Sequence, residues 1–369
     1  MVKLSLGYMK YVLFVGGALS VAASMVSAGG IERRVDPSQI LFEKGKNYLE
    51  FSAVTGHPTV SGDPLPGIPA GPTGNIANSY QTYALGYKRE LNDRISLAFV
   101  IDEPVGVSLA YTSPTAFFGG STAEVSSIAY TGLAKYQFTD RFSVYGGLRV
   151  IGVDGDISVS SPVTVSSPYN LSVSKDYQVG YLVGAAFEIP DIALRIAATY
   201  ESKTEHDFRD NTGTPFQVEI PQAFTLHARS GITANTLLFG SVRWREWTKF
   251  RVQPSDFLTL VPGVGVVNNP IAGGTSDIWT YELGIGHQFN ENWSGAATIG
   301  YEKDNGDIVG NFSGTDGYVS YGLAVSYETD DWKVTTGVRY FELGSADSSV
   351  TAFSGNEAIS AGVKVSYKF

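Results

Sequence analysis

The 369-residue sequence contains no cysteine, and only 17% of its residues are charged. The missing cysteine excludes disulfide-stapled scaffolds, thiolate metal sites and cysteine catalysis. After residue 28 there is no apolar run of about 18 residues, which argues against a polytopic helical membrane protein. The formal net charge of −10 at pH 7 argues against a nucleic-acid partner. What is abundant is glycine, with 42 residues, together with 20 Phe and 21 Tyr, and this composition favours an all-β protein.

The first 28 residues have the layout of a secretory signal peptide. Lys3 and Lys10 form a basic start, an apolar stretch follows over residues 11–23, and residues 26–28 form a small-residue cleavage site. The apolar stretch is too short for a membrane anchor. We therefore expect export of the chain and removal of residues 1–28.

Apolar and polar residues alternate through the rest of the sequence. Near its end, Ala361, Val363, Val365 and Tyr367 alternate with small or polar residues. A period of two over about ten residues is typical of a strand with one apolar and one polar face. The same alternation recurs over residues 177–187, 192–200, 319–327 and 332–340.

The connections between these segments differ in length. Six short polar turns alternate with seven long loops rich in Gly, Pro and Ser, residues 155–174 among them, so the pattern predicts fourteen strands. An even strand number, short turns at one end and long loops at the other are typical of bacterial outer-membrane barrels. We predict an all-β, transmembrane, antiparallel β-barrel of about 14 strands over residues 47–369, in the outer membrane of a Gram-negative bacterium. A soluble sandwich or lipocalin-like barrel is the alternative, but its apolar face would point inward.

Three stretches point to one family. Residues 29–52 start with two glycines, residues 102–106 read DEPVG within a strand pattern, and residues 242–250 read VRWREWTKF. Together they resemble the FadL-type outer-membrane transporters of long-chain fatty acids and other hydrophobic compounds. The resemblance implies a fourteen-stranded barrel plugged by an N-terminal hatch, here residues 29–46. The hatch residues expected to matter are Arg33, Arg34, Asp36 and Pro37; a loose periplasmic tail is the alternative.

The third strand pattern is interrupted. Pro104 cannot donate to a ladder, so this residue and Gly106 require a bulge or kink. Apolar residues resume afterwards, at Val107 and Leu109, on the same odd-numbered parity as Leu97 before the interruption. The resemblance implies that the kink opens the barrel wall and lets a hydrophobic substrate leave sideways into the lipid. A purely structural bulge is the alternative.

Arginines on the lumen-facing phase are candidates for a substrate carboxylate. Arg149, Arg243 and Arg339 each lie toward the outer-loop end of their strand, and a guanidinium can hold a carboxylate through two hydrogen bonds. The alternative is that they pair with other charges that fill the lumen. We expect at least one of the three to bind the head group of a fatty acid.

The loop after residue 247 contains Phe257, Leu258 and Leu260, which predict a capture groove for an apolar substrate, with loop packing as the alternative. No motif for catalysis, a metal or a cofactor occurs. The sequence therefore predicts a monomeric transporter for passive uptake of long-chain fatty acids or similar hydrophobic molecules, in contact with outer-membrane lipid. Uptake of aromatic hydrocarbons is the main alternative, ahead of a general porin or a lipid hydrolase.

Overall fold

The computed structural model describes residues 31–33, 36–306 and 308–369. The expected signal peptide and the hatch residue Arg34 lie outside the described residues. The described chain consists mainly of β-strands, with short 3-10 helices η1 (Pro37–Phe42), η2 (Pro190–Ile192) and η3 (Trp247–Lys249). In this part of the chain, no helix has the length and apolar character needed to cross a membrane.

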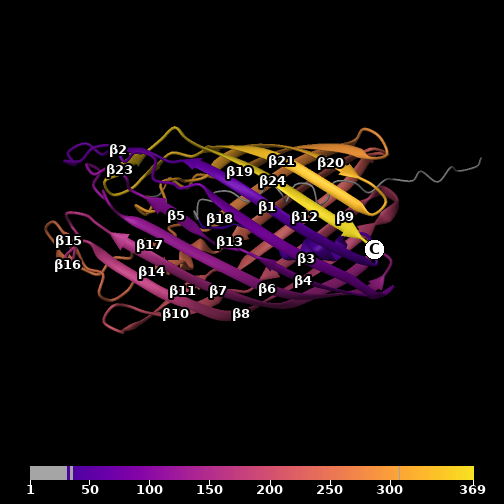
Figure 1. Cartoon of the computed structure of the whole chain (residues 1–369), viewed down its shortest axis with the longest axis horizontal. Coiled ribbons are helices and arrows are strands. Elements are labelled where there is room, and N and C mark those ends of the chain that lie inside the picture. The colour runs from indigo at the N-terminus through magenta and orange to yellow at the C-terminus, as the bar shows by residue number, and fades with distance from the viewer. Residues whose placement is uncertain (1–30, 34–35, 307) are drawn as a thin grey trace, which may run out of the picture.

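One antiparallel sheet closes on itself as a barrel (Figure 1). Most barrel strands pair with the barrel strands before and after them in the chain, and β1 pairs with β24 to close the ring. Both β4 and β5 pair with β6 and are two halves of one interrupted strand. The barrel therefore has 14 strands, which confirms the prediction from the sequence. The barrel strands are β1 (Asn47–Thr59), β3 (Tyr80–Asn92), β4 (Ile95–Asp102), β5 (Val107–Ala110), β6 (Thr122–Thr139), β7 (Phe142–Val159), β8 (Tyr169–Ile189), β9 (Leu194–Glu201), β12 (Ala223–Thr233), β13 (Thr236–Arg245), β18 (Ile278–Gln288), β19 (Trp293–Glu302), β20 (Tyr318–Glu328), β21 (Trp332–Leu343) and β24 (Asn356–Lys368).

The alternating apolar and polar residues of each strand lie on opposite faces of the barrel wall. Val179 and Leu323 point outward and are 66% and 63% exposed, whereas Thr131, Ser320 and Ser360 on the inner face are fully buried. An apolar exterior and a polar interior are the arrangement that a barrel needs in lipid. The apolar side chains that point outward from the barrel thus form the lipid-facing surface.

The two ends of the barrel differ. Short turns at residues 93–94, 140–141 and 329–331 lie at the end where the first and last strands meet, and Asn47 N donates to Phe369 O there at 3.0 Å. The C-terminus is at the right in Figure 1, and the long loops carrying β2, β15, β16 and β23 are at the left. Short turns of such barrels face the periplasm, so the long loops face outward from the cell.

The outer loops contain small sheets of their own. Residues 155–159 and 169–174, expected as loop from their composition, instead extend β7 and β8, because these two strands stay paired up to Val159 and Tyr169. The loop strands are β2 (Gly62–Pro64), β10 (Thr204–Arg209), β11 (Pro215–Ile220), β14 (Arg251–Val252), β15 (Thr259–Val261), β16 (Gly265–Val267), β17 (Ala272–Gly273), β22 (Ala346–Asp347) and β23 (Thr351–Phe353).

Candidate functional site

The interruption between β4 and β5 is a bulge that changes which side chains face the lumen. Residues 103–106 lie opposite residues 126–128 of β6, so the kinked strand carries one extra residue. Because side chains alternate with a period of two, one extra residue exchanges the two faces of the strand. Phe99 before the kink faces outward and is 47% exposed, whereas Leu109 after it is 5% exposed and faces the lumen. The odd-numbered apolar positions, which face outward before the kink, thus face the lumen after it.

The kink turns Val105 into the barrel. Val105 N donates to Ser127 Oγ at 3.0 Å, and this hydroxyl in turn donates to Val105 O at 2.5 Å. A side chain of β6 therefore replaces the ladder partners that the bulge removes. The Val105 side chain is 1% exposed as a result.

A gap in the ladder adjoins the kink. The outer residues of β3, residues 80–84, have no strand partner on the kink side within the described chain, because β3 and β4 pair only from Leu85 and Ile101 onward. We call the gap between residues 80–84 and 103–106 the wall window. The Arg33 guanidinium lies across it, with Cζ 3.4 Å from the centre of the Tyr80 ring.

The start of the hatch pairs with the kink. Arg33 N donates to Pro104 O at 2.8 Å, and Gly106 N donates to Ile31 O at 2.7 Å. Glu32 lies between these two bonds, opposite Val105 in an antiparallel bridge. The hatch thus supplies some of the main-chain hydrogen bonds that the interrupted strand lacks.

Buried ion pairs connect the hatch to the lumen wall. Arg243 donates to Glu32 at 2.7 Å and to Glu201 at 2.8 Å, and Arg149 donates to Glu201 at 2.9 Å. Every charged side chain of this set is at most 9% exposed. The set, here called the arginine network, is balanced in formal charge and consists of Arg149, Arg243, Arg245, Asp102, Glu32 and Glu201.

Asp36 anchors the helical part of the hatch. Its carboxylate accepts hydrogen bonds from Ser38 N at 2.9 Å, Gln39 Nε2 at 3.1 Å and Thr199 Oγ1 of β9 at 3.0 Å, and it lies 3.2 Å from His227 Nε2 of β12. Burial raises the pKa of Asp36, but the hydrogen bond and charge of His227 and the bonds from Ser38 outweigh it and hold the pKa below its usual range. The short motif that begins at Asp36 therefore fixes η1 to two barrel strands, with Pro37 as a first helical residue.

An apolar cavity lies on the outer side of the kink and encloses about 1330 Å³, its open mouth included. Ligand sites are lined mainly by apolar side chains, so this lining suits a hydrophobic molecule. The ionisable side chains that line it in the described chain are Asp154 and Asp316, both acidic. The apolar lining includes Ile31, Val105, Val107, Phe208, Phe216, Ile220, Trp247 and Phe312.

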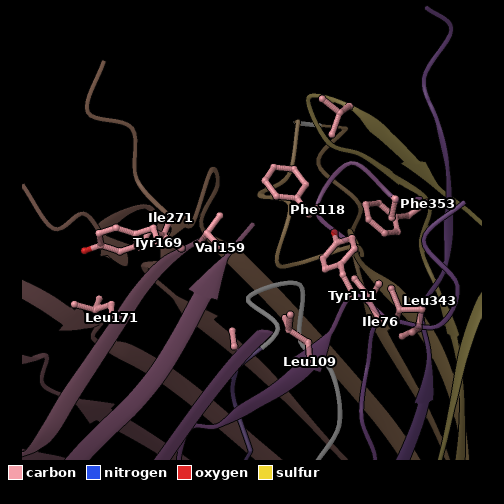
Figure 2. Packing of buried hydrophobic residues seen from close by; sticks show 14 of the residues in the cluster. Ile76, Leu109, Tyr111, Phe118, Val159, Tyr169, Leu171, Ile271, Leu343 and Phe353 are labelled. Carbon is pink, nitrogen blue, oxygen red and sulfur yellow. The ribbon is translucent and has the colours of Figure 1, made fainter. Parts of the chain in front are cut away.

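The outer rim of this cavity is formed by packed apolar residues from distant parts of the chain (Figure 2). The outer loops therefore turn their apolar side chains inward, toward one another, which hides them from water. In Figure 2 the labelled side chains form two groups, Val159, Tyr169, Leu171 and Ile271 on one side and Ile76, Tyr111, Phe118, Leu343 and Phe353 on the other, with Leu109 between them.

A smaller polar chamber shares Ile220 with the apolar cavity. Its space, about 380 Å³ with open solvent included, is lined by Pro104 of the kink and by Arg149, Glu201 and Arg245 of the arginine network. The site therefore has an apolar part toward the outer loops and a charged part beside the hatch.

The residues chosen from the sequence occupy several different places. Phe257 packs against Tyr169 in the rim with ring centres 5.1 Å apart, Leu258 O accepts from Val165 N at 3.0 Å, and Leu260 is 52% exposed on the β15–β16 hairpin. None of Phe257, Leu258 and Leu260 is among the residues that line the apolar cavity in the described structure.

The structure brings two of the three candidate arginines together. Arg149 and Arg243 share Glu201 in the arginine network, whereas Arg339 donates separately to Glu282 at 2.5 Å. Each of the three already has a carboxylate partner. The sequence reasoning missed Val105 and Ile31 as cavity residues, because the bulge that turns Val105 inward has no signature beyond the neighbouring Pro104.

A closed barrel with an apolar exterior, a hatch in its lumen and an apolar cavity beside a gap in its wall defines an outer-membrane protein that handles hydrophobic compounds. The chain belongs to the family described as outer membrane protein transport protein (OMPP1/FadL/TodX), whose model matches residues 50–347. This is a family of transport proteins, and with the barrel fold it places the chain in the outer membrane of a Gram-negative bacterium.

Solved structures share this fold at low sequence identity. A FadL homologue from Pseudomonas aeruginosa has a TM-score of 0.74 and 13% identity, over 95% of this chain and 96% of that chain. The toluene transporter TodX from Pseudomonas putida has a TM-score of 0.65 and 13% identity, over 95% of this chain and 100% of that chain. Among curated proteins, none matches this sequence.

Proposed function

We propose that the chain takes up uncharged hydrophobic molecules passively. The observation that carries this proposal is the apolar cavity, whose ionisable lining in the described chain consists of Asp154 and Asp316. A carboxylate in this space would be desolvated beside like charges, and an unpaired buried charge costs several kcal/mol. Toluene, transported by the relative TodX, is an uncharged molecule of the favoured class.

The charge of the outer loops supports the same substrate class. Acidic residues outnumber basic ones across the long outer connections. The resulting negative potential at the outer mouth of the barrel repels anions. A fatty-acid anion would meet this field before it reached the cavity. The basic residues of these connections are Lys203, Arg209, Lys249, Arg251 and Lys303.

The proposed route runs from the outer mouth into the cavity and leaves through the wall window. Val105 belongs to both features, since it lines the cavity and lies within the kink. Movement of Arg33 away from Tyr80 would connect the cavity to the bilayer. The barrel encloses this route by itself, so we propose that it works as a monomer surrounded by outer-membrane lipid.

A matched substrate pair tests the proposal. Uptake of 1-dodecanol and of dodecanoate is compared in cells that differ only in the presence of the chain, at pH 8 and at low and high salt. We expect faster protein-dependent uptake of the alcohol, and dodecanoate uptake that rises with salt as the acidic mouth is screened. Equal or faster uptake of dodecanoate at low salt would contradict the proposal.

The polar chamber favours a second candidate function, the uptake of long-chain fatty acids. A fatty acid could place its chain in the apolar cavity and its carboxylate beside Arg149, whose Nε has no hydrogen-bond partner in the described structure. In that case replacement of the arginine that holds the carboxylate, tested with Arg149→Gln, Arg243→Gln and Arg339→Gln, should weaken fatty-acid binding by about 10- to 100-fold, as loss of a charge-assisted hydrogen bond does. If all three variants bind dodecanoate like the unmodified chain, no one of these arginines is needed to hold the carboxylate.

A further inference from the structure

Two arginines face each other near the periplasmic end of the lumen. Arg195 of β9 and Arg229 of β12 are direct partners in the ladder and lie on its inner face. Like charges directly opposite each other destabilise a strand pair. This pair therefore needs an anion close to both guanidinium groups.

The described protein supplies that anion only in part. Arg195 Nη1 and Arg229 Nε are buried and have no hydrogen-bond partner in the described chain. The Glu188 carboxylate is 3.9 Å from Arg195 Nη1, beyond hydrogen-bond distance, although the Arg195 side chain is only 8% exposed. Buried donors without acceptors are costly, so these N–H groups are available to a ligand.

The hatch forms one side of this site. The Phe42 ring lies 4.3 Å from Arg195 Cζ and 4.9 Å from Lys135 Nζ. The carboxylates that act electrostatically on the two arginines are Glu43 and Glu188. Arg195 and Lys135 therefore lie against Phe42, with Arg229 beside Arg195, and these three cations outnumber the carboxylates of Glu43 and Glu188. The arginine network differs, because there cations and carboxylates are equal in number and Arg243 has carboxylate oxygens at 2.7 and 2.8 Å.

We propose that Arg195, Arg229 and Lys135 bind a phosphate group beneath the hatch. Guanidinium groups match phosphate oxygens in pairs, and the lysine adds a point charge. The three side chains face the lumen, so the phosphate enters from the periplasmic water as part of a small soluble molecule. Bound there, it removes the repulsion between the arginines and stabilises the position of Phe42.

Titration with inorganic phosphate tests this site. Binding to the complete mature chain in a non-ionic detergent is followed by calorimetry at low salt. We expect one saturable site, weakened about tenfold or more by Arg229→Gln, since one charge-assisted hydrogen bond is lost. Arg141→Gln, in an exposed periplasmic turn, is the matched control and should bind like the unmodified chain. Absence of saturable binding, or equal binding by Arg229→Gln, would overturn the site.

Two further measurements complete the test. The first shows whether a variant has lost the phosphate site or the fold, and the second shows whether the ligand is a soluble phosphate compound or a lipid head group. Heat-modifiable gel mobility shows whether each variant still forms the barrel, and Arg229→Lys, which keeps the charge, should bind phosphate with an intermediate affinity. The titration is then repeated in nanodiscs with and without anionic phospholipid. Unchanged phosphate affinity supports a soluble ligand, whereas displacement of phosphate by the anionic lipid would overturn that assignment in favour of a lipid head group.

Discussion

Two carboxylates fix the hatch at its two described ends. Asp36 binds η1 to β9 and β12, and Glu32 joins the paired start of the hatch to Arg243 and Arg245 of β13. Both are buried, and both accept hydrogen bonds from the barrel wall. At the scale of single residues, the hatch is therefore held by charge rather than by apolar packing alone.

Removal of the Asp36 charge should loosen η1. In Asp36→Asn the bonds to Thr199 and His227 lose their ionic character, at a cost of about 1.5–3 kcal/mol. We expect amide hydrogen exchange over residues 38–42 to become about 10- to 100-fold faster. The exposed Asp140→Asn provides the control, and unchanged exchange in Asp36→Asn would show that the hatch is held by other contacts.

The lowered pKa of Asp36 gives the hatch a defined pH dependence. A carboxyl whose pKa is lower in the docked state than in the undocked one stabilises docking fully above its ordinary pKa of about 4 and loses this effect as the pH falls further. Exchange at residues 38–42, corrected for intrinsic rates, should therefore rise as the pH falls below about 4. In Asp36→Asn this acid-dependent rise should be smaller.

At the scale of elements, the one extra residue in the kink has two consequences. It leaves the outer part of β3 without a ladder partner on the kink side in the described chain, and it turns Val107 and Leu109 into the lumen. Deletion of Pro104 would leave three residues opposite three and restore the register of the strand. We expect this deletion to abolish uptake of an uncharged substrate while heat-modifiable mobility stays normal. Deletion of Gly263, at a loop tip, should leave uptake unchanged. Normal uptake without Pro104 would reduce the kink to a structural bulge.

The hatch and the window meet at Arg33. Replacing it with alanine removes the guanidinium from the face of Tyr80 and leaves the gap beside β3 unfilled. We expect Arg33→Ala to raise the initial rate of uptake severalfold, measured with a fluorescent uncharged lipophile. Arg209→Ala on the outer surface is the control. A rate equal to that of the control would show that Arg33 does not limit exit.

Much of the whole molecule could be predicted from the sequence, and the candidate site only in part. The period-two alternation depends on local chemistry, so it predicts the strands, their number and the polar lumen. Pro104 also marks the interruption, because proline disturbs any ladder. The partners of Arg149 and Arg243 could not be predicted, since Glu201 and Glu32 are distant in sequence and meet them only in the folded barrel. The inward turn of Val105 depends on its contact with Ser127, which no sequence period encodes.

Orientation is a property of the complete barrel and is tested with surface tags. A tag at Gly213 or Gly265, both in long loops, should be labelled on intact cells, and a tag at Asp140 or Asn290 should be labelled only after the outer membrane is permeabilised. Labelling of Asn290 on intact cells would reverse the assigned orientation.

The position of the hatch also constrains the order of assembly. Glu32 meets Arg243 across 211 residues of chain, and Asp36 meets His227 across 191. These receiving residues lie on the neighbouring strands β12 and β13, far along the chain from the hatch, so the hatch has no docking place until these strands have formed. Contacts so distant in sequence form only after the intervening chain is ordered. The described part of the hatch therefore docks only after β12 and β13 are in place, although it precedes them in the chain.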